Sequence, residues 1–113
     1  MPSASKLLCL LLPVAVLTMA AAELSPDKNW EKHCHSCHGK DGRSQTRLGK
    51  KSGAKDLTDA AQQAKLTDEA VFKTIKEGRK NAKGEEKMEA FAGQMSDAEI
   101  TALVTYVRGL AKK

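Results

Sequence analysis

Residues 34–38 read Cys34-His35-Ser36-Cys37-His38, which is a C-x-x-C-H pattern. On a helix, Cys34 and Cys37 lie on one face, and His38 shares that face with them. Two thiols followed directly by an imidazole are typical of covalent haem attachment, in which the sulfurs form thioethers to the porphyrin edge and the histidine binds the iron. We therefore expect Cys34 and Cys37 to hold one haem c and His38 to be an axial iron ligand. Such a haem carries one electron at a time, which predicts an electron-transfer protein.

Three other interpretations of this motif stay open at the level of sequence. A thioredoxin-like redox pair needs a βαβ context, and the chain lacks the β-branched runs that are typical of strands. A zinc site would need His33, His35 or His38 as further ligands, although all three histidines lie within six residues of one another. A disulfide that staples one turn would leave His38 without a role.

The first 22 residues have the pattern of a secretory signal peptide. Lys6 precedes an apolar run, and Ala20-Ala21-Ala22 supplies an A-x-A cleavage site. We predict cleavage after Ala22, which divides the chain into a signal peptide (1–22) and one small domain (23–113) exported to the periplasm or a similar compartment. The alternative is an uncleaved membrane anchor, but an apolar run of 13 residues is short for a bilayer span.

Composition narrows the functions open to the domain 23–113. It keeps 18 basic and 14 acidic residues, and it has no basic pattern interleaved with aromatic residues of the kind that binds nucleic acid. Its lysines are either a solvated face or a rim that steers docking onto an acidic redox partner. Removal of Cys9 with the signal peptide leaves no free thiol beyond the motif. Few aromatic residues are present, which agrees with a cofactor in the core: Trp30, Phe72, Phe91 and Tyr106.

Capping signals and apolar spacing predict an all-α chain. A first helix should run from the N-cap Ser25 to Gly39, and a glycine- and lysine-rich loop over 39–57 should wrap one haem edge. A short helix is expected over 59–65, and residues 79–94 read as a long irregular stretch.

Two later helices carry clearer signals. Thr67 is the expected N-cap of a helix that ends at Gly78. Ser96-Asp97-Ala98-Glu99 forms a capping box that should begin the last helix. The residues that follow the capping box place one apolar stripe on that helix: Ile100, Leu103, Val104 and Val107.

The second axial ligand of the iron should come from late in the chain. No histidine follows His38, so Met88 and Met95 are the remaining candidates with suitable side chains. Met95 directly precedes the N-cap Ser96, where it would pack against Ile100 as a hydrophobic staple. Met88 stands in a polar stretch without such a role. We therefore predict Met88 as the second ligand, with Met95 as the alternative.

These motifs together resemble the class I c-type cytochromes, the small soluble single-haem cytochromes c with His/Met ligation. The resemblance rests on residues 34–38, on Lys87-Met88-Glu89-Ala90-Phe91, on residues 95–100 and on Tyr106-Val107-Arg108. It implies a small cytochrome c fold in which the first and last helices cross and Trp30 lies near Tyr106. The chain departs from the family pattern at two positions, with Glu89 in place of the usual proline and Pro26 in place of a frequent glycine.

The expected function is that of a monomeric electron carrier, not an enzyme, which shuttles electrons between larger redox proteins outside the cytoplasm. The rival is a peroxidase-like or gas-binding haem site with an open distal face, although the sequence shows no distal acid–base pair. The ring nitrogen of His38 that does not bind iron should donate to a backbone carbonyl after Gly39. Four residues are candidate contacts for the haem propionates, with an ordinary surface position as the alternative for each: Gln45, Thr46, Arg47 and Arg79.

Overall fold

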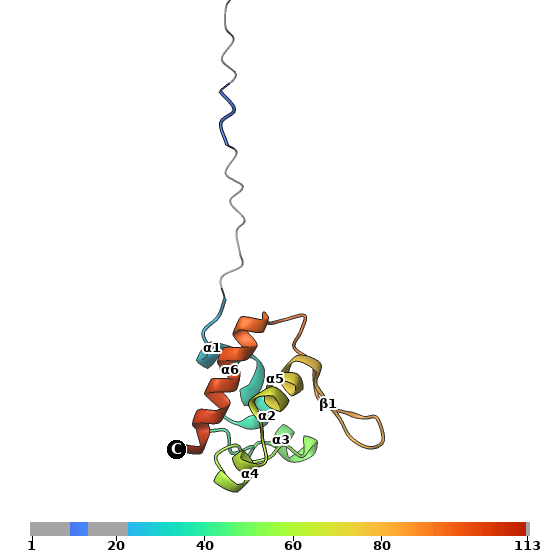
Figure 1. Ribbon diagram of the computed structural model, residues 1–113. Coiled ribbons are helices and arrows are strands. Elements are labelled where there is room, and N and C mark those ends of the chain that lie inside the picture. Colours follow the sequence, from blue (N-terminus) through green and yellow to red (C-terminus); the bar gives the residue numbers. More distant parts are fainter. Residues whose placement is uncertain (1–9, 14–22, 113) are drawn as a thin grey trace, which may run out of the picture.

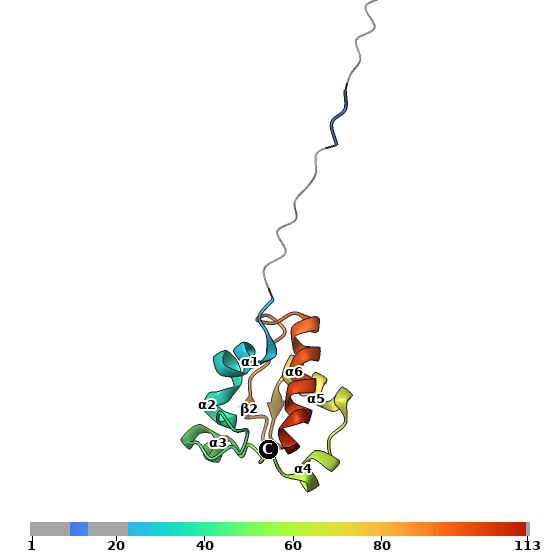
Figure 2. The ribbon, with the colours of Figure 1, turned by 90° about the vertical axis from the view of Figure 1, so that its left-hand side faces the viewer.

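The computed structural model describes residues 10–13 and 23–112 (Figures 1 and 2). Most of the predicted signal peptide lies outside these residues, so cleavage after Ala22 stays a prediction. Within the described ranges, no helix has both the length and the apolar character needed to cross a membrane.

The first helix begins after Ser25 and ends before Gly39, as predicted, but it is not a uniform α-helix. A first turn, α1 (Pro26–Asn29), leads into a π-helical turn, η1 (Trp30–Cys34), and then into α2 (His35–His38). In the wider turn, the N–H of His35 donates to the carbonyl of Trp30. A single widened turn has no residue signature of its own, so the periodicity did not predict it. Such turns often occur at functional sites.

The segment expected to be a loop contains the short helix α3 (Arg47–Ser52). The Thr46 side chain caps it by accepting a hydrogen bond from the N–H of Gly49. Gly49 lies so close to α2 that a Cβ there would collide with the carbonyl of Cys37. Helix α3 has no apolar stripe of its own. It is stabilised instead by its cap and by its contact with α2. The prediction of a loop was therefore wrong for residues 47–52.

The remaining helices agree with the prediction. Helix α4 (Ala60–Ala64) is capped by Asp59, and α5 (Asp68–Glu77) is capped by Thr67 and ends at Gly78. Helix α6 (Asp97–Gly109) has the complete capping box and continues into a 3₁₀ turn, η2 (Leu110–Lys112). All four residues of its expected apolar stripe are buried: Ile100, Leu103, Val104 and Val107.

Residues 79–94 were expected to be irregular, but they contain a β-hairpin. Strand β1 (Arg79–Lys80) pairs antiparallel with β2 (Glu86–Met88), and Arg79 lies opposite Met88. The Asn81 side chain closes the turn by accepting hydrogen bonds from the N–H groups of Lys83 and Glu85. Two strands this short cannot show alternating polarity, so no sequence pattern indicated them. The tip of the hairpin projects away from the helices (Figure 1).

The first and last helices pack together, as the resemblance implied. The rings of Trp30 and Tyr106 lie 5.2 Å apart between their centroids. The fully buried Asn29 side chain donates to the Glu99 carboxylate at 2.8 Å, which ties α1 to the start of α6. Figure 1 shows α1 beside α6. The core around this contact includes Met95, which is 5% exposed.

Candidate functional site

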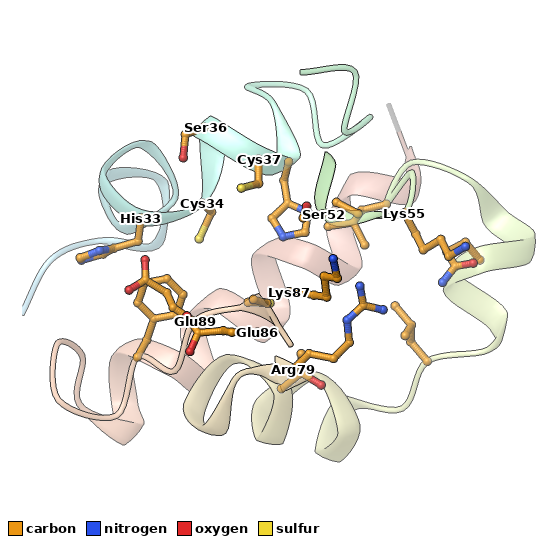
Figure 3. Close-up of a pocket in the computed structure, with 18 residues that line it drawn as sticks. His33, Cys34, Ser36, Cys37, Ser52, Lys55, Arg79, Glu86, Lys87 and Glu89 are labelled. Carbon is orange, nitrogen blue, oxygen red and sulfur yellow. The ribbon is translucent and has the colours of Figure 1, made fainter. Parts of the chain in front are cut away.

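A cavity of about 520 Å³ lies between the C-x-x-C-H segment and the hairpin (Figure 3). Cys34, Cys37 and His38 line it from the first helix, and Met88 lines it from β2. A smaller, apolar cavity of about 140 Å³ is lined by Cys34, His38 and Met88 as well and extends toward Leu103 in the core. Cofactor sites typically occupy roughly 300–1,000 Å³ and are mostly apolar. The larger cavity therefore has the size and the chemistry of a cofactor site.

The backbone at the end of α2 is held in place by the residues around it. The Thr46 hydroxyl donates to the carbonyl of Cys37 at 2.7 Å, and the N–H of Ser44 donates to the carbonyl of His38 at 2.9 Å. The Trp30 indole donates to the carbonyl of Gly39 at 3.0 Å. The last carbonyls of a helix lack partners within the helix. Here three of them are satisfied by side chains or by the loop, so the backbone of the motif is hydrogen-bonded without a ligand.

The two cysteines of the motif are free thiols, not a disulfide. Burial, and then the proximity of Cys37, raise the pKa of the Cys34 thiol to about 12. Cys34 is therefore protonated and uncharged at neutral pH, which suits the apolar wall that it lines. Two unpaired thiols at the edge of one cavity are the groups needed for two thioether bonds.

His38 is held as a neutral imidazole. Burial lowers its pKa, and the positive charge of Arg79 lowers it further. Its Nδ1 is buried and has no hydrogen-bond partner. A buried polar atom without a partner costs about 1–3 kcal/mol, and a neutral imidazole is a common metal ligand. The residue therefore fits the role of an iron ligand.

The predicted hydrogen bond from His38 to a backbone carbonyl after Gly39 is absent, so that prediction was wrong. In the segment after Gly39, the carbonyl of Gly42 accepts from the N–H of Leu57, and the carbonyl of Lys55 accepts from the Ser44 hydroxyl. The buried Nδ1 of His38 has no partner.

The opposite wall of the cavity is built by the hairpin and the end of α5. Met88 is half-buried and pairs with Arg79 across the hairpin. Gly78 adopts a φ of 77° with an extended ψ, a conformation almost restricted to glycine. A Cβ at Gly78 would meet the carbonyl of Met88 at 2.5 Å. After Met88 the chain returns to α5, where the N–H of Phe91 donates to the carbonyl of Ile75 at 3.0 Å.

The structure separates the two candidate methionines. Met88 lines both cavities. Met95 lies in the core with Ile100, both buried, and it is not among the residues that line either cavity. Glu86 and Glu89, which flank Met88 in the sequence, lie across the cavity from Cys34 and Cys37 in Figure 3.

Of the four candidate propionate contacts, Arg79 alone lines the larger cavity. Thr46 is used to cap α3 and to bond the Cys37 carbonyl, and Gln45 and Arg47 are exposed and absent from the lining. Ser52 and Lys55 line the cavity from the α3 side (Figure 3). Sequence reasoning placed both in the segment expected to wrap one haem edge, but it did not single them out as lining residues. No local signal could have found them, because their position depends on how α3 packs against α2.

The other two histidines do not complete a metal site with the motif. His33 lines the cavity, and its ring lies 5.3 Å from that of Phe91, edge-on. Across the chain segments described, no three or more His, Cys, Asp or Glu side chains come together in a way that could hold a metal ion.

Comparison with known proteins gives the family. Residues 21–107 match the family model described as cytochrome c oxidase, cbb3-type, subunit III. The KustC0563 c-type cytochrome is 38% identical, with a TM-score of 0.69, over 77% of this chain and 98% of its own. A point mutant of that cytochrome matches with a TM-score of 0.68 and the same identity, over 77% of this chain and 99% of its own.

A third solved structure, the c-type cytochrome XoxG from Methylobacterium extorquens AM1, is 25% identical with a TM-score of 0.55, over 76% of this chain and 48% of its own. No curated protein sequence gives a significant match. The family match over most of the chain, together with the identity to a solved cytochrome along nearly its whole length, places this chain among the c-type cytochromes, which bind haem c covalently and use it to transfer electrons.

Proposed function

We propose that the protein is a one-electron carrier in which Cys34 and Cys37 hold one haem c and His38 and Met88 are the axial ligands of its iron. When bound, the haem supplies a one-electron iron couple. The observation that carries the proposal is that these four side chains line a single cavity, whereas Met95 does not. The redox partners would be larger donor and acceptor proteins outside the cytoplasm, and the carrier would act as a monomer.

The rigidity of the hairpin supports Met88 as a ligand. The sequence has Glu89 where related cytochromes usually have a proline, which raises the question of what holds the methionine in place. The pairing of Arg79 with Met88 restrains the strand, and the hydrogen bond from Phe91 to Ile75 anchors its far end to α5. Gly78, at the end of α5, allows the backbone of Met88 to approach α5 closely, because glycine has no Cβ. These restraints substitute for the proline by fixing the backbone on both sides of Met88.

The apolar side chains around the site have a separate role. The smaller cavity is lined by core residues of three helices, among them Trp30, Ile75 and Leu103, which are all buried. They exclude water from the inner part of the site. A thioether ligand and a dry surrounding both favour the reduced, less charged iron and so raise the reduction potential.

Export is part of the proposal. Directly after the predicted cleavage point, Glu23 accepts a hydrogen bond from the Ser96 hydroxyl at 2.8 Å, and the N–H of Leu24 donates to Glu99 at 3.2 Å. Cleavage after Ala22 would leave both contacts intact. The mass of the protein purified from the periplasm should equal residues 23–113 plus one haem. A mass that includes residues 1–22 would contradict the cleavage and favour the membrane anchor.

The ligand assignment is tested by comparing Met88→Ala with Met95→Ala. The oxidised protein should show the weak far-red charge-transfer band of an iron–thioether bond. Met88→Ala should abolish the band and lower the reduction potential. Met95→Ala should lower the free energy of unfolding by about 2–5 kcal/mol, because it leaves a cavity in the core, and should keep the band.

Two outcomes would overturn the assignment. Survival of the far-red band in Met88→Ala would show that another residue binds the iron. Rapid carbon monoxide binding by the unmodified reduced protein would show an open distal face, which would favour a gas-binding site over an electron carrier.

A further inference from the structure

The excess positive charge of the domain is concentrated in one segment. From Lys40 to Lys55 there are six basic residues and one acidic residue. The rest of 23–113 contains twelve basic and thirteen acidic residues, so it is close to neutral. The net positive charge of the domain therefore lies mainly in this segment. Its six basic residues form a basic surface on and beside α3, which we call the α3 surface: Lys40, Arg43, Arg47, Lys50, Lys51 and Lys55.

The charges of the α3 surface are available to a partner. All six side chains belong to exposed residues. Within the part of the chain that the structure describes, only Arg43 of the six has an ion pair, a contact of 3.8 Å with Asp41. The helix also exposes one large apolar side chain, Leu48, which is 50% exposed. Exposed apolar and basic side chains on one short segment are a composition that suits a protein docking surface.

The segment that carries the α3 surface contacts the haem-binding motif directly. Gly49 rests against the carbonyl of Cys37, and the Thr46 hydroxyl bonds that same carbonyl. The Ser44 hydroxyl donates to the carbonyl of Lys55 at 2.6 Å, which closes the segment into a compact unit. Lys55 also lines the cavity. Figure 2 shows α3 directly beside α2. A protein bound at this surface would therefore lie close to Cys37, one of the two residues proposed to bind the haem covalently.

The hairpin on the other side of the cavity has a different charge pattern. From Arg79 to Glu89 there are four basic and three acidic residues, so this segment is close to neutral, and Lys87 forms an ion pair of 3.8 Å with Glu85. An acidic partner would thus meet nearly balanced charges at the hairpin and a large excess of positive charge at the α3 surface. The contrast selects one side of the cavity for docking.

We propose that the α3 surface is the electron-exchange docking site and that its partner is a redox protein with a carboxylate-rich surface around an apolar patch. This inference rests on the proposed function, because docking beside the cavity is useful only if electrons pass there. Attraction between the two charged surfaces would raise the rate of encounter and would weaken as salt is added.

The test uses hexacyanoferrate(III), a small anionic oxidant, as the probe of local charge. The rate constant for oxidation of the reduced holoprotein is measured at low and at high ionic strength. Lys50→Glu/Lys51→Glu alters the α3 surface. Lys65→Glu/Lys73→Glu is the matched control, because it changes the net charge equally at exposed lysines that do not line the cavity.

At low ionic strength we expect the α3 variant to react about tenfold more slowly than the unmodified protein and the control to be much less affected. The difference should vanish at high ionic strength. Equal slowing in both variants would overturn the proposal, since only net charge would then matter. If the Glu variant fails to fold, Lys50→Gln/Lys51→Gln against Lys65→Gln/Lys73→Gln gives the same comparison with smaller effects.

A second measurement locates the binding directly. A peptide of glutamates is titrated into the reduced holoprotein, and backbone amide shifts are followed by NMR. Shifts confined to 40–55 support the α3 surface, and shifts elsewhere contradict it. The proposed function fails separately, if the unmodified protein carries no haem or is not reversibly reduced.

Discussion

The two walls of the cavity are built in different ways. The wall that carries Cys34, Cys37 and His38 is assembled from a single stretch of chain, and its supporting bonds come from residues close by, such as Trp30 to Gly39. The wall that carries Met88 depends on a hairpin and on the end of α5, which meet only in the folded state. A short motif can therefore specify the first wall, whereas packing must specify the second.

The largest effect is expected from removing the two thiols of the first wall. Cys34→Ser/Cys37→Ser should abolish covalent haem attachment, because no other thiol among the residues that the structure describes lines the cavity. Mass spectrometry of the denatured protein should show the bare polypeptide. Cys9→Ser is the control, and it should leave the mass of the exported protein unchanged. Retention of covalent haem in the double variant would refute the role assigned to the motif.

The second prediction concerns the wall that carries Met88, which we call the Met88 wall. Gly78→Ala should lower the free energy of unfolding by about 1–3 kcal/mol for its backbone conformation alone, and by more because its Cβ would meet the Met88 carbonyl. It should also weaken the far-red band. Gly53→Ala is the control, because Gly53 also has a positive φ of 73° but open space around it. It should be milder and should keep the band. Equal effects on the band would mean that Gly78 does not position Met88.

The third prediction concerns a glycine that packs against the wall that carries Cys34, Cys37 and His38. Gly49→Ala would force α3 away from the carbonyl of Cys37. Overpacking of this kind typically costs about 1–3 kcal/mol, which chemical denaturation can measure. The far-red band should persist, because the Met88 wall is untouched. Loss of the band in this variant would show that the two walls are coupled more strongly than the bonding pattern indicates.

The smallest effect is expected for Glu99, which lies at the start of α6 and outside both walls of the cavity. Hydrogen bonds from the Asn29 side chain, the Ser96 backbone and the Leu24 backbone lower the pKa of the Glu99 carboxyl. Because the pKa is lower in the folded state, the carboxylate stabilises the fold above its ordinary pKa and loses that contribution as the pH falls through the folded value. Glu99→Gln should therefore reduce the acid sensitivity of Tm below about pH 4.5. An unchanged acid profile would contradict this role.

The helices with strong local signals were predicted correctly, and the segments without them were not. The capping box at Ser96 and the apolar stripe after it are visible in the sequence because each residue acts on a neighbour one or two turns away. Helix α3 and the hairpin depend on partners outside themselves, on Cys37 for the first and on α5 for the second. The hydrogen bond expected from His38 is absent as well, because it would depend on how the segment after Gly39 folds against the imidazole.

The sequence by itself determined the attachment chemistry, the mainly helical character and the starts of the first helix, α4, α5 and α6. These properties depend on residue type and short spacing, which a linear pattern records. Only the tertiary structure decided which methionine lines the cavity, what holds it in the absence of a proline, and that α3 carries the basic charges beside the motif. Those outcomes depend on contacts between residues distant in the chain, and their energies arise only when the helices pack.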